Sequence, residues 1–271
     1  MRTSITISIT LLATAAFTDS YPIVDIPPVY ALMSQISSQN TAANLEILLE
    51  PTQSAHHFTL KPSQAAKLTE HSPLVVVGGH FSESVQEAYH NLNAEGLAYS
   101  ILEDAAEDPH FWMDPIAIKD AARKLSKVMP AADLSHEMQY HFEEKLNAID
   151  AETSKHKFDL GIIVGHAAFD RFIKKYNVPY FGALTDEDDQ AAAPSDRAKM
   201  EAAIDDGKVQ CLILDSAEPN PDLEDFATSN DIEFAYVDTT GWTLLDADHP
   251  NPERFFDDFF DQLALAFSQC K

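Results

Sequence analysis

The amino-acid sequence predicts an α/β fold in which most strands run parallel. Short β-rich runs alternate with segments whose apolar residues recur at helical spacing, and this alternation is typical of proteins built from βαβ units. The chain has 271 residues, of which 45% are hydrophobic, so it is long and apolar enough to form one large domain or two ordinary ones. A disordered acidic protein is therefore excluded.

Six strands are expected from runs of four or five residues, and helices should fill the gaps between them. The strands lie at Ile23–Ile26, Leu45–Leu49, Leu74–Val77, Leu160–Val164, Cys211–Leu214 and Phe234–Val237. Ser82 is placed to cap a helix whose apolar face begins at Val85. Asp114 followed by Pro115 is a typical N-cap and first position of a second helix.

Residues 133–156 are predicted to form one long amphipathic helix. The segment contains no Gly or Pro, and apolar residues recur at helical spacing from Met138 to Ile149. A helix of this length between two α/β patterns is interpreted as a connector. It would join an N-terminal α/β lobe over residues 21–132 to a C-terminal α/β lobe over residues 157–271.

Residues 1–20 have the pattern of a secretory signal peptide. Arg2 supplies positive charge, residues 5–16 carry no charge, and Ala13-Thr14-Ala15 offers a cleavage site of the A-x-A type. The apolar stretch is too short to span a bilayer comfortably, and no Cys lies near the cleavage site. We therefore expect an exported protein without a membrane anchor. The alternative is an unusual N-terminal segment that is buried in the fold.

The charge of the chain restricts its partners. There are 44 Asp and Glu against 18 Lys and Arg, a formal net charge of −26. Such a chain repels phosphate backbones and anionic membrane surfaces, so nucleic acid is not expected as a partner, whereas small cations are. The acidic run at residues 185–190 is interpreted as a solvated loop, and a role for it in capturing cations stays open.

Cys211 and Cys270 are the only cysteines. In an oxidising compartment an isolated pair most simply forms one disulfide, which we expect to tie the last helix to a central strand of the C-terminal lobe. Their spacing excludes a CxxC redox motif. Two buried free thiols are the alternative.

Candidate ligands for a metal ion follow the predicted strands. His56, His166 and Asp238 each come after a strand, and ligands of open α/β sheets bind beyond the carboxyl ends of the strands. His110 lies in an aromatic-rich loop between two prolines, directly before a helix. Three imidazoles and one carboxylate suit tetrahedral Zn²⁺. Taken singly, each histidine is more often a surface or hydrogen-bonded structural residue.

Several blocks of sequence, taken in order, resemble those of the periplasmic zinc- and manganese-binding proteins that serve ABC importers, the cluster A-I metal solute-binding proteins. The most specific is Asp108–Pro115, which is similar to their DPHxWLDP block. The others are Ile26–Leu32, Ser54–Ser63, Val164–Phe169, Ala193–Ser195 and Val237–Gly241. The correspondence covers most of the mature chain.

The resemblance implies two α/β lobes with mainly parallel sheets, a long rigid connecting helix and a metal site in the cleft between the lobes. The ligands it implies are His56, His110, His166 and Asp238. The three-histidine pattern is similar to that of zinc members, whereas manganese members usually have glutamate as the third ligand. The implied function is that of a monomeric periplasmic receptor, not an enzyme, which captures Zn²⁺ and delivers it to an ABC permease.

The sequence departs from the family pattern at three places. The His-rich loop of many zinc members is absent between Phe81 and Asp108. His80 is an additional histidine after the third strand, at a position from which it could enter the cleft. His57 stands where an acidic residue is common, and we expect it at the surface or behind the ligands.

Three other functions remain as alternatives: a manganese or iron receptor, a stand-alone zinc metallochaperone, and a zinc hydrolase. The hydrolase is disfavoured because the sequence has no HExxH motif. In addition, Asp238 would fill the position that a catalytic zinc leaves open for water. The receptor readings predict stoichiometric binding and no turnover of ester, phosphate or peptide substrates.

Overall fold

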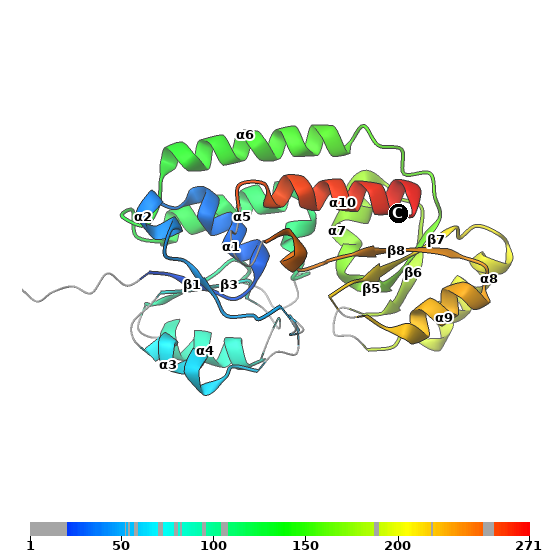
Figure 1. Ribbon diagram of the computed structural model, residues 1–271, viewed down its shortest axis with the longest axis horizontal. Helices are drawn as coiled ribbons and strands as arrows, with labels where there is room; N and C mark the ends of the chain where they lie inside the picture. The colour runs from blue at the N-terminus through cyan, green and yellow to red at the C-terminus, as the bar shows by residue number, and fades with distance from the viewer. Residues whose placement is uncertain are drawn as a thin grey trace, which may run out of the picture.

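The structure is a computed structural model. It describes residues 21–51, 53, 55–56, 59–69, 73–78, 81, 83–93, 96–103, 108–186, 190–217, 219–245 and 252–271. Within these residues the chain forms two α/β lobes joined by a long helix (Figure 1), as the sequence predicts. None of the helices so described is long and apolar enough to cross a membrane. The predicted signal peptide at residues 1–20 lies outside the described residues.

The N-terminal lobe is built on a parallel sheet with strand order β2-β1-β3-β4. Its strands are β1 (Ile23–Val24), β2 (Glu46–Ile47), β3 (Leu74–Val76) and β4 (Ala98–Ser100). The residues of β1 and β3 are buried, as expected for central strands covered on both faces. In Figure 1, α1 (Pro27–Ile36), α2 (Gln39–Ala42) and α5 (Pro115–Val128) lie above this sheet, and α3 (Pro62–Thr69) and α4 (Glu83–Asn93) lie below it.

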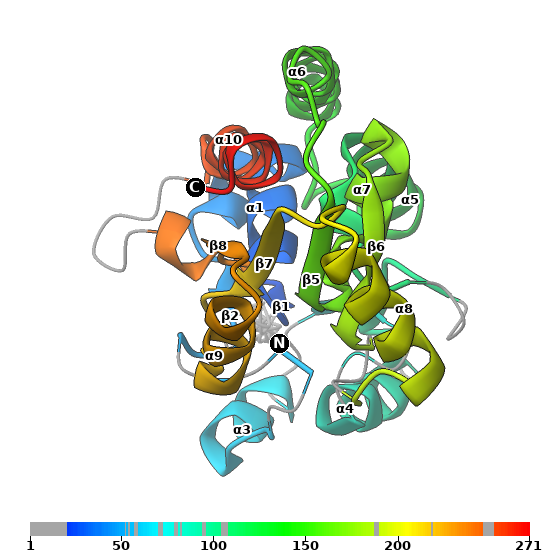
Figure 2. The same cartoon turned by 90° about the vertical axis from the view of Figure 1, so that its right-hand side faces the viewer.

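The C-terminal lobe repeats this plan with strand order β6-β5-β7-β8, again all parallel. Its strands are β5 (Ile162–His166), β6 (Tyr180–Thr185), β7 (Cys211–Asp215) and β8 (Glu233–Val237). In Figure 2, α8 (Pro194–Asp205) and α9 (Pro221–Ser229) cover one face of the sheet. The other face is covered by α7 (Asp170–Tyr176) and α10 (Phe255–Gln269).

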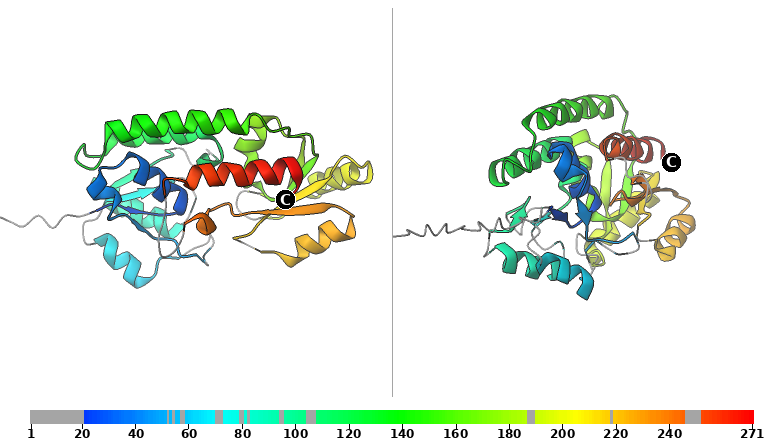
Figure 3. Two further views of the ribbon diagram at one scale, coloured as in Figure 1. Left: turned by 45° about the horizontal axis from the view of Figure 1, so that its top comes forward. Right: turned by 60° about the vertical axis from the view of Figure 1, so that its left-hand side comes forward.

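Two long helices pack against each other where the lobes join. The connector α6 (His136–Thr153) begins at Ser135, whose side chain accepts a hydrogen bond from the Met138 N–H. Beside it lies α10, which in Figure 3 begins near the boundary between the lobes and runs over the C-terminal lobe, whereas α6 runs over the N-terminal lobe toward that boundary. They are joined by an ion pair of 2.6 Å between Lys145 and Asp257, and by Phe142 and Phe256, whose ring centroids are 5.6 Å apart. The lobes are therefore held by a pair of helices, of which the sequence indicated only the first as a connector.

The predicted disulfide is confirmed. Cys211 begins β7, an interior strand of the C-terminal sheet, and Cys270 is the C-cap of α10. Their Cα atoms are 5.8 Å apart and their sulfurs are bonded. Both residues are buried, so the bond anchors the end of α10 in the core.

All six predicted strands are present, although the first two are shorter than expected, and the helix cap at Asp114 is confirmed by its 2.9 Å bond from the Ile116 N–H. Strands β4 and β6 were not predicted from the sequence. The first is only three residues long and contains Ser100. The second contains Gly182, which has φ +143° and packs against Met200, so neither shows a continuous apolar run.

Candidate metal centre

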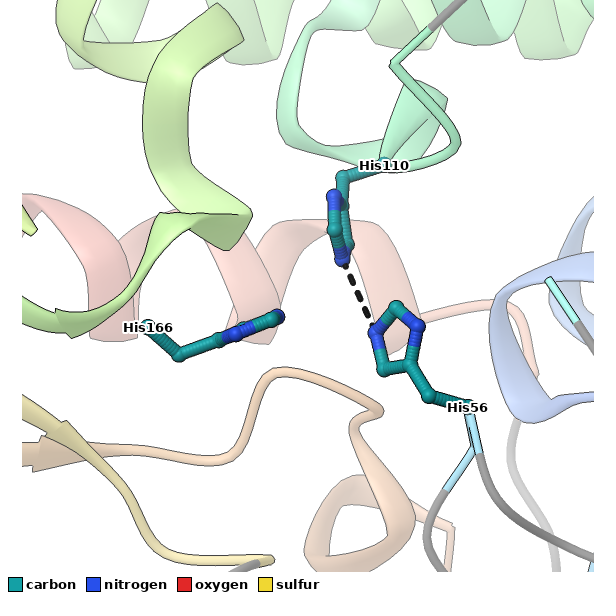
Figure 4. A group of neighbouring side chains, drawn as sticks. All are labelled: His56, His110 and His166. Atoms are coloured by element: carbon teal, nitrogen blue, oxygen red, sulfur yellow. Dashed lines mark hydrogen bonds between the residues drawn. The ribbon is translucent and has the colours of Figure 1, made fainter. Parts of the chain in front are cut away.

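Three of the four predicted ligands come together between the lobes. The side chains of His56, His110 and His166 point toward one another in Figure 4, and one nitrogen from each lies within 4.8 Å of the other two. The Nε2 atoms of His56 and His110 are 3.3 Å apart. His110 is buried and the other two are half-buried. Within the described residues, this is the group of metal-ligand side chains that converges closely enough to hold an ion.

Each histidine is positioned by the end of a strand or by the loop that follows it. His166 is the last residue of β5, whose preceding residues are all buried. His56 comes from the loop after β2, and its ring packs on Phe81 with centroids 4.9 Å apart. His110 comes from the loop between β4 and α5. The site therefore lies at the carboxyl edges of both sheets, where parallel sheets present their ligands.

The segment that carries His110, residues 108–114, is held in place by identifiable contacts. After His110 the chain enters the short 3-10 helix η1 (Phe111–Met113), whose three side chains are buried, and Asp114 then caps α5. The indole of Trp112 packs against the His110 ring at 5.3 Å and donates a 2.8 Å hydrogen bond to the carbonyl of Thr239 in the other lobe. This loop is thus held by the cores of both lobes.

Asp108 orients the buried His110 ring. One oxygen of Asp108, Oδ1, lies 3.0 Å from His110 Nδ1 and accepts a 2.9 Å hydrogen bond from the His110 backbone N–H. A carboxylate at one ring nitrogen favours the tautomer whose other nitrogen is free to bind a metal. Nε2 therefore faces the other histidines with its lone pair.

The electrostatics also favour a neutral imidazole at His110. Burial lowers the pKa of His110, opposed by Asp108 and assisted by the positive groups around it. Burial alone would raise the pKa of Asp108, but its hydrogen bonds to His110 and the nearby charges outweigh this and lower it. A neutral imidazole is the form that ligates metals.

The histidines face a hollow whose size fits an ion. Its volume is ≈ 10 Å³, about the space of one water molecule. The lining side chains other than the histidines include Phe81, Trp112, Asp215, Thr239 and Thr240. The hollow thus combines three histidine side chains, aromatic walls and one half-buried carboxylate.

The structure does not bring Asp238 into the histidine group. Asp238 follows β8 at the same sheet edge and is buried, but its carboxylate accepts hydrogen bonds from its own turn. The donors are the N–H and hydroxyl of Thr240, the N–H of Gly241, and the N–H and hydroxyl of Thr243, at 2.7–3.2 Å. Gly241 has φ +71°, and a Cβ there would lie 2.5 Å from the Phe255 ring. The hydrogen bonds of this carboxylate therefore stabilise the turn beside the site.

Asp215 is the carboxylate that sequence reasoning missed. It is the last residue of β7 and lines the hollow with the histidines. Its oxygens accept bonds from the Ala217 N–H at 2.8 Å, the Thr239 N–H at 3.3 Å and the Thr239 hydroxyl. Burial raises its pKa to about 6, and the negative charge of Asp238 adds to the shift. The signal that could have found it is the strand-end rule already applied to His166.

Other singled-out groups fall partly outside the described residues. His57 and His80 both lie there, and so do residues 187–189 of the acidic run. At the edges of that run, the Asp186 N–H bonds the Gln190 carbonyl at 2.8 Å. The roles considered for these groups stay predictions.

Comparison with known proteins shows the family to which this sequence is similar. A protein-family model described as ZnuA, zinc-uptake complex component A, periplasmic, matches residues 23–261. A putative metal-binding protein of Thermotoga maritima is 31% identical over 100 residues, and this match spans 36% of each chain.

Solved structures share the fold. The periplasmic zinc-binding protein TroA of Treponema pallidum superposes with a TM-score of 0.74 at 16% identity, covering 92% of this chain and 99% of that one. FpvC of Pseudomonas aeruginosa in complex with Mn²⁺ gives 0.70 at 12% identity, covering 93% and 99%.

Proposed function

This chain belongs to the family of periplasmic zinc-uptake component A proteins, and we propose that it is a receptor that captures Zn²⁺ outside the inner membrane and delivers it to an ABC-type permease. The observation that carries the proposal is the convergence of three histidines on a hollow large enough for one ion. The disulfide supports export, because such bonds persist in oxidising compartments.

We assign His56, His110 and His166 as the direct ligands. Three neutral imidazole nitrogens favour Zn²⁺ over Mn²⁺, because Mn²⁺ is the weakest binder of the Irving–Williams order and prefers oxygen-rich sites. Direct ligation by Asp238 would require its carboxylate to give up hydrogen bonds within its turn. We therefore assign it to the support of the site, with water or Asp215 facing the fourth position of the metal.

A manganese receptor is the second candidate, because the FpvC complex shows that this fold also binds Mn²⁺. The carboxylate of Asp215 on the wall of the hollow is an oxygen ligand of the kind Mn²⁺ prefers. Calorimetric titration of the metal-free protein with both ions tests the choice: the proposal requires one Zn²⁺ per chain and a much weaker response to Mn²⁺.

Exchanging one nitrogen ligand for oxygen should change this selectivity. His166→Glu is expected to lower the ratio of zinc to manganese affinity by at least ~10-fold, since it replaces an imidazole with the ligand type Mn²⁺ prefers. His141→Glu, which introduces the same charge at an exposed position on α6, is the control. An unchanged ratio in His166→Glu would remove His166 from the ligand set.

The hydrolase alternative is disfavoured because the matching family is one of zinc-uptake components and because the sequence has no HExxH motif. Zinc-loaded protein should therefore show no turnover of ester, phosphate or peptide substrates.

A free-standing metallochaperone differs from the receptor in the protein that receives the zinc. Transfer of zinc to membranes that contain the cognate permease therefore distinguishes a receptor from a metallochaperone.

Zinc binding should weaken as the pH falls, because protons compete with the metal for the three imidazoles. Unperturbed imidazole titrates near pH ~6.5. Burial lowers the pKa of His110, so this ring stays neutral to a lower pH than an unperturbed imidazole would. We expect affinity to fall more than ~10-fold between about pH 7.5 and pH 5.5, measured by chelator competition. Equal affinity at both values would contradict histidine ligation.

A further inference from the structure

Helix α7 of the C-terminal lobe contacts the N-terminal loop that carries His110. Arg171, on the first turn of α7, places Nε 3.2 Å from Asp108 Oδ2, and another guanidinium nitrogen donates a 2.6 Å hydrogen bond to the Asp108 backbone carbonyl. The side chains of Arg171 and Asp108 are only 26% and 19% exposed. This is a two-point contact of a planar guanidinium with one residue of the opposite lobe.

The contact continues to the metal ligand. The other oxygen of Asp108, Oδ1, binds Nδ1 and the backbone N–H of His110. The opposite ring nitrogen, Nε2, lies 3.3 Å from His56 Nε2. Arg171, Asp108 and His110 therefore form a continuous chain of polar contacts that ends at the site.

The same stretch of the C-terminal lobe supplies His166. His166 ends β5, and η2 (Ala167–Phe169) leads directly into α7 and Arg171. One turn further along α7, Lys175 lies 3.2 Å from Asp114 at the far end of the His110 loop. Segment 166–175 thus carries His166 and also contacts Asp108 and Asp114, which flank His110.

We propose that Arg171 is a positioning residue for metal binding: by fixing Asp108 across the lobe boundary, it holds the His110 imidazole in the orientation that meets His56 and His166. This inference rests on the proposed function, because it assumes that the three histidines bind the metal. As a consequence, the contact that docks the two lobes through Arg171 and Asp108 also orients the His110 ring.

Two effects of removing Arg171 have opposite signs. Loss of a positive charge near a cation site, which leaves the negative charge of Asp108 without its cationic partner, would tighten zinc binding by simple electrostatics. Loss of orientation frees the Asp108 carboxylate to turn, and the loss of such supporting contacts typically costs ~10–100-fold in metal affinity. Positioning therefore predicts weaker binding, and electrostatics alone predicts stronger binding.

The test compares Arg171→Met and Arg171→Lys with the wild type by zinc-chelator competition. Arg171→Met should bind zinc ~10–100-fold more weakly. Arg171→Lys should recover part of the loss, because lysine keeps the charge but cannot make both contacts. Arg123→Met is the matched control, since it removes an Arg–carboxylate pair between exposed Arg123 of α5 and half-buried Glu143 of α6. Its affinity should equal that of the wild type.

A double-mutant cycle shows whether Arg171 acts through Asp108. In the Asp108→Asn background, Arg171→Met should change zinc affinity by less than ~3-fold. An equal loss in both backgrounds, or unchanged or tighter zinc binding in Arg171→Met, would overturn the proposal. If Arg171→Met fails to fold, as judged by circular dichroism, the same comparison is made with Arg171→Lys, where wild-type affinity would overturn it.

The proposed function and the positioning role of Arg171 are overturned by different results. If wild-type protein binds no zinc, or His110→Ala binds it normally, the proposed function fails. If both of those results are as expected and only Arg171→Met behaves like wild type, the function stands and the positioning role falls.

Discussion

Replacing His110 by alanine is expected to weaken zinc binding by at least ~100-fold. Four-ligand zinc sites in small peptides bind with apparent free energies of about 10–16 kcal/mol, so one ligand contributes about 3 kcal/mol. His110 is the most buried of the three histidines and is preorganised by Asp108 and Trp112. Its loss therefore removes a ligand that water cannot replace equally well.

Calorimetry and chelator competition measure this effect on the metal-free protein. His141→Ala is the matched control, because His141 is an exposed histidine on α6 and its loss should leave zinc affinity unchanged. Circular dichroism should show both variants folded. Wild-type affinity in His110→Ala would mean that the metal binds elsewhere.

Removing the disulfide should produce the largest effect on stability. Replacing Cys211 and Cys270 together by alanine is expected to lower the free energy of unfolding by about 4 kcal/mol, because the bond closes a loop whose ends are 59 positions apart. The consequence should concentrate at the end of α10, which the bond anchors to β7. Both sites are buried. Alanine has no polar side-chain atom, so it leaves no unsatisfied polar group there.

Urea unfolding of the metal-free protein, followed by circular dichroism, measures the change. Wild-type protein unfolded in the presence of a reductant is the control and should resemble the double variant, whereas addition of reductant to the double variant should change nothing. An unchanged midpoint in the double variant would show that the cross-link does not stabilise the fold.

The sequence was sufficient to predict the parallel sheets, the connecting helix and the convergence of three histidines. Each of those histidines follows or ends a strand, or precedes a capped helix, and a sheet's carboxyl edge is where such residues gather. The rule places residues at an edge without giving the direction of their side chains. Asp238 satisfied it, but its carboxylate turned to the N–H groups of its own turn.

Two other features could not be read from local patterns. Asp215 was hidden because it ends an apolar strand as a single acidic residue among many in a chain with 44 Asp and Glu. The contact between Arg171 and Asp108 joins residues of different lobes, and nothing in the periodicity of either segment specifies how the lobes dock. Such contacts depend on tertiary packing.

The most direct test of the central claim is elemental analysis of the exported protein, purified without added metal, followed by competition with a zinc chelator. We expect one zinc per chain, removed only by a strong chelator and not displaced by excess Mn²⁺. Protein that carries manganese in preference to zinc, or that retains neither ion and does not take up added zinc, would contradict it.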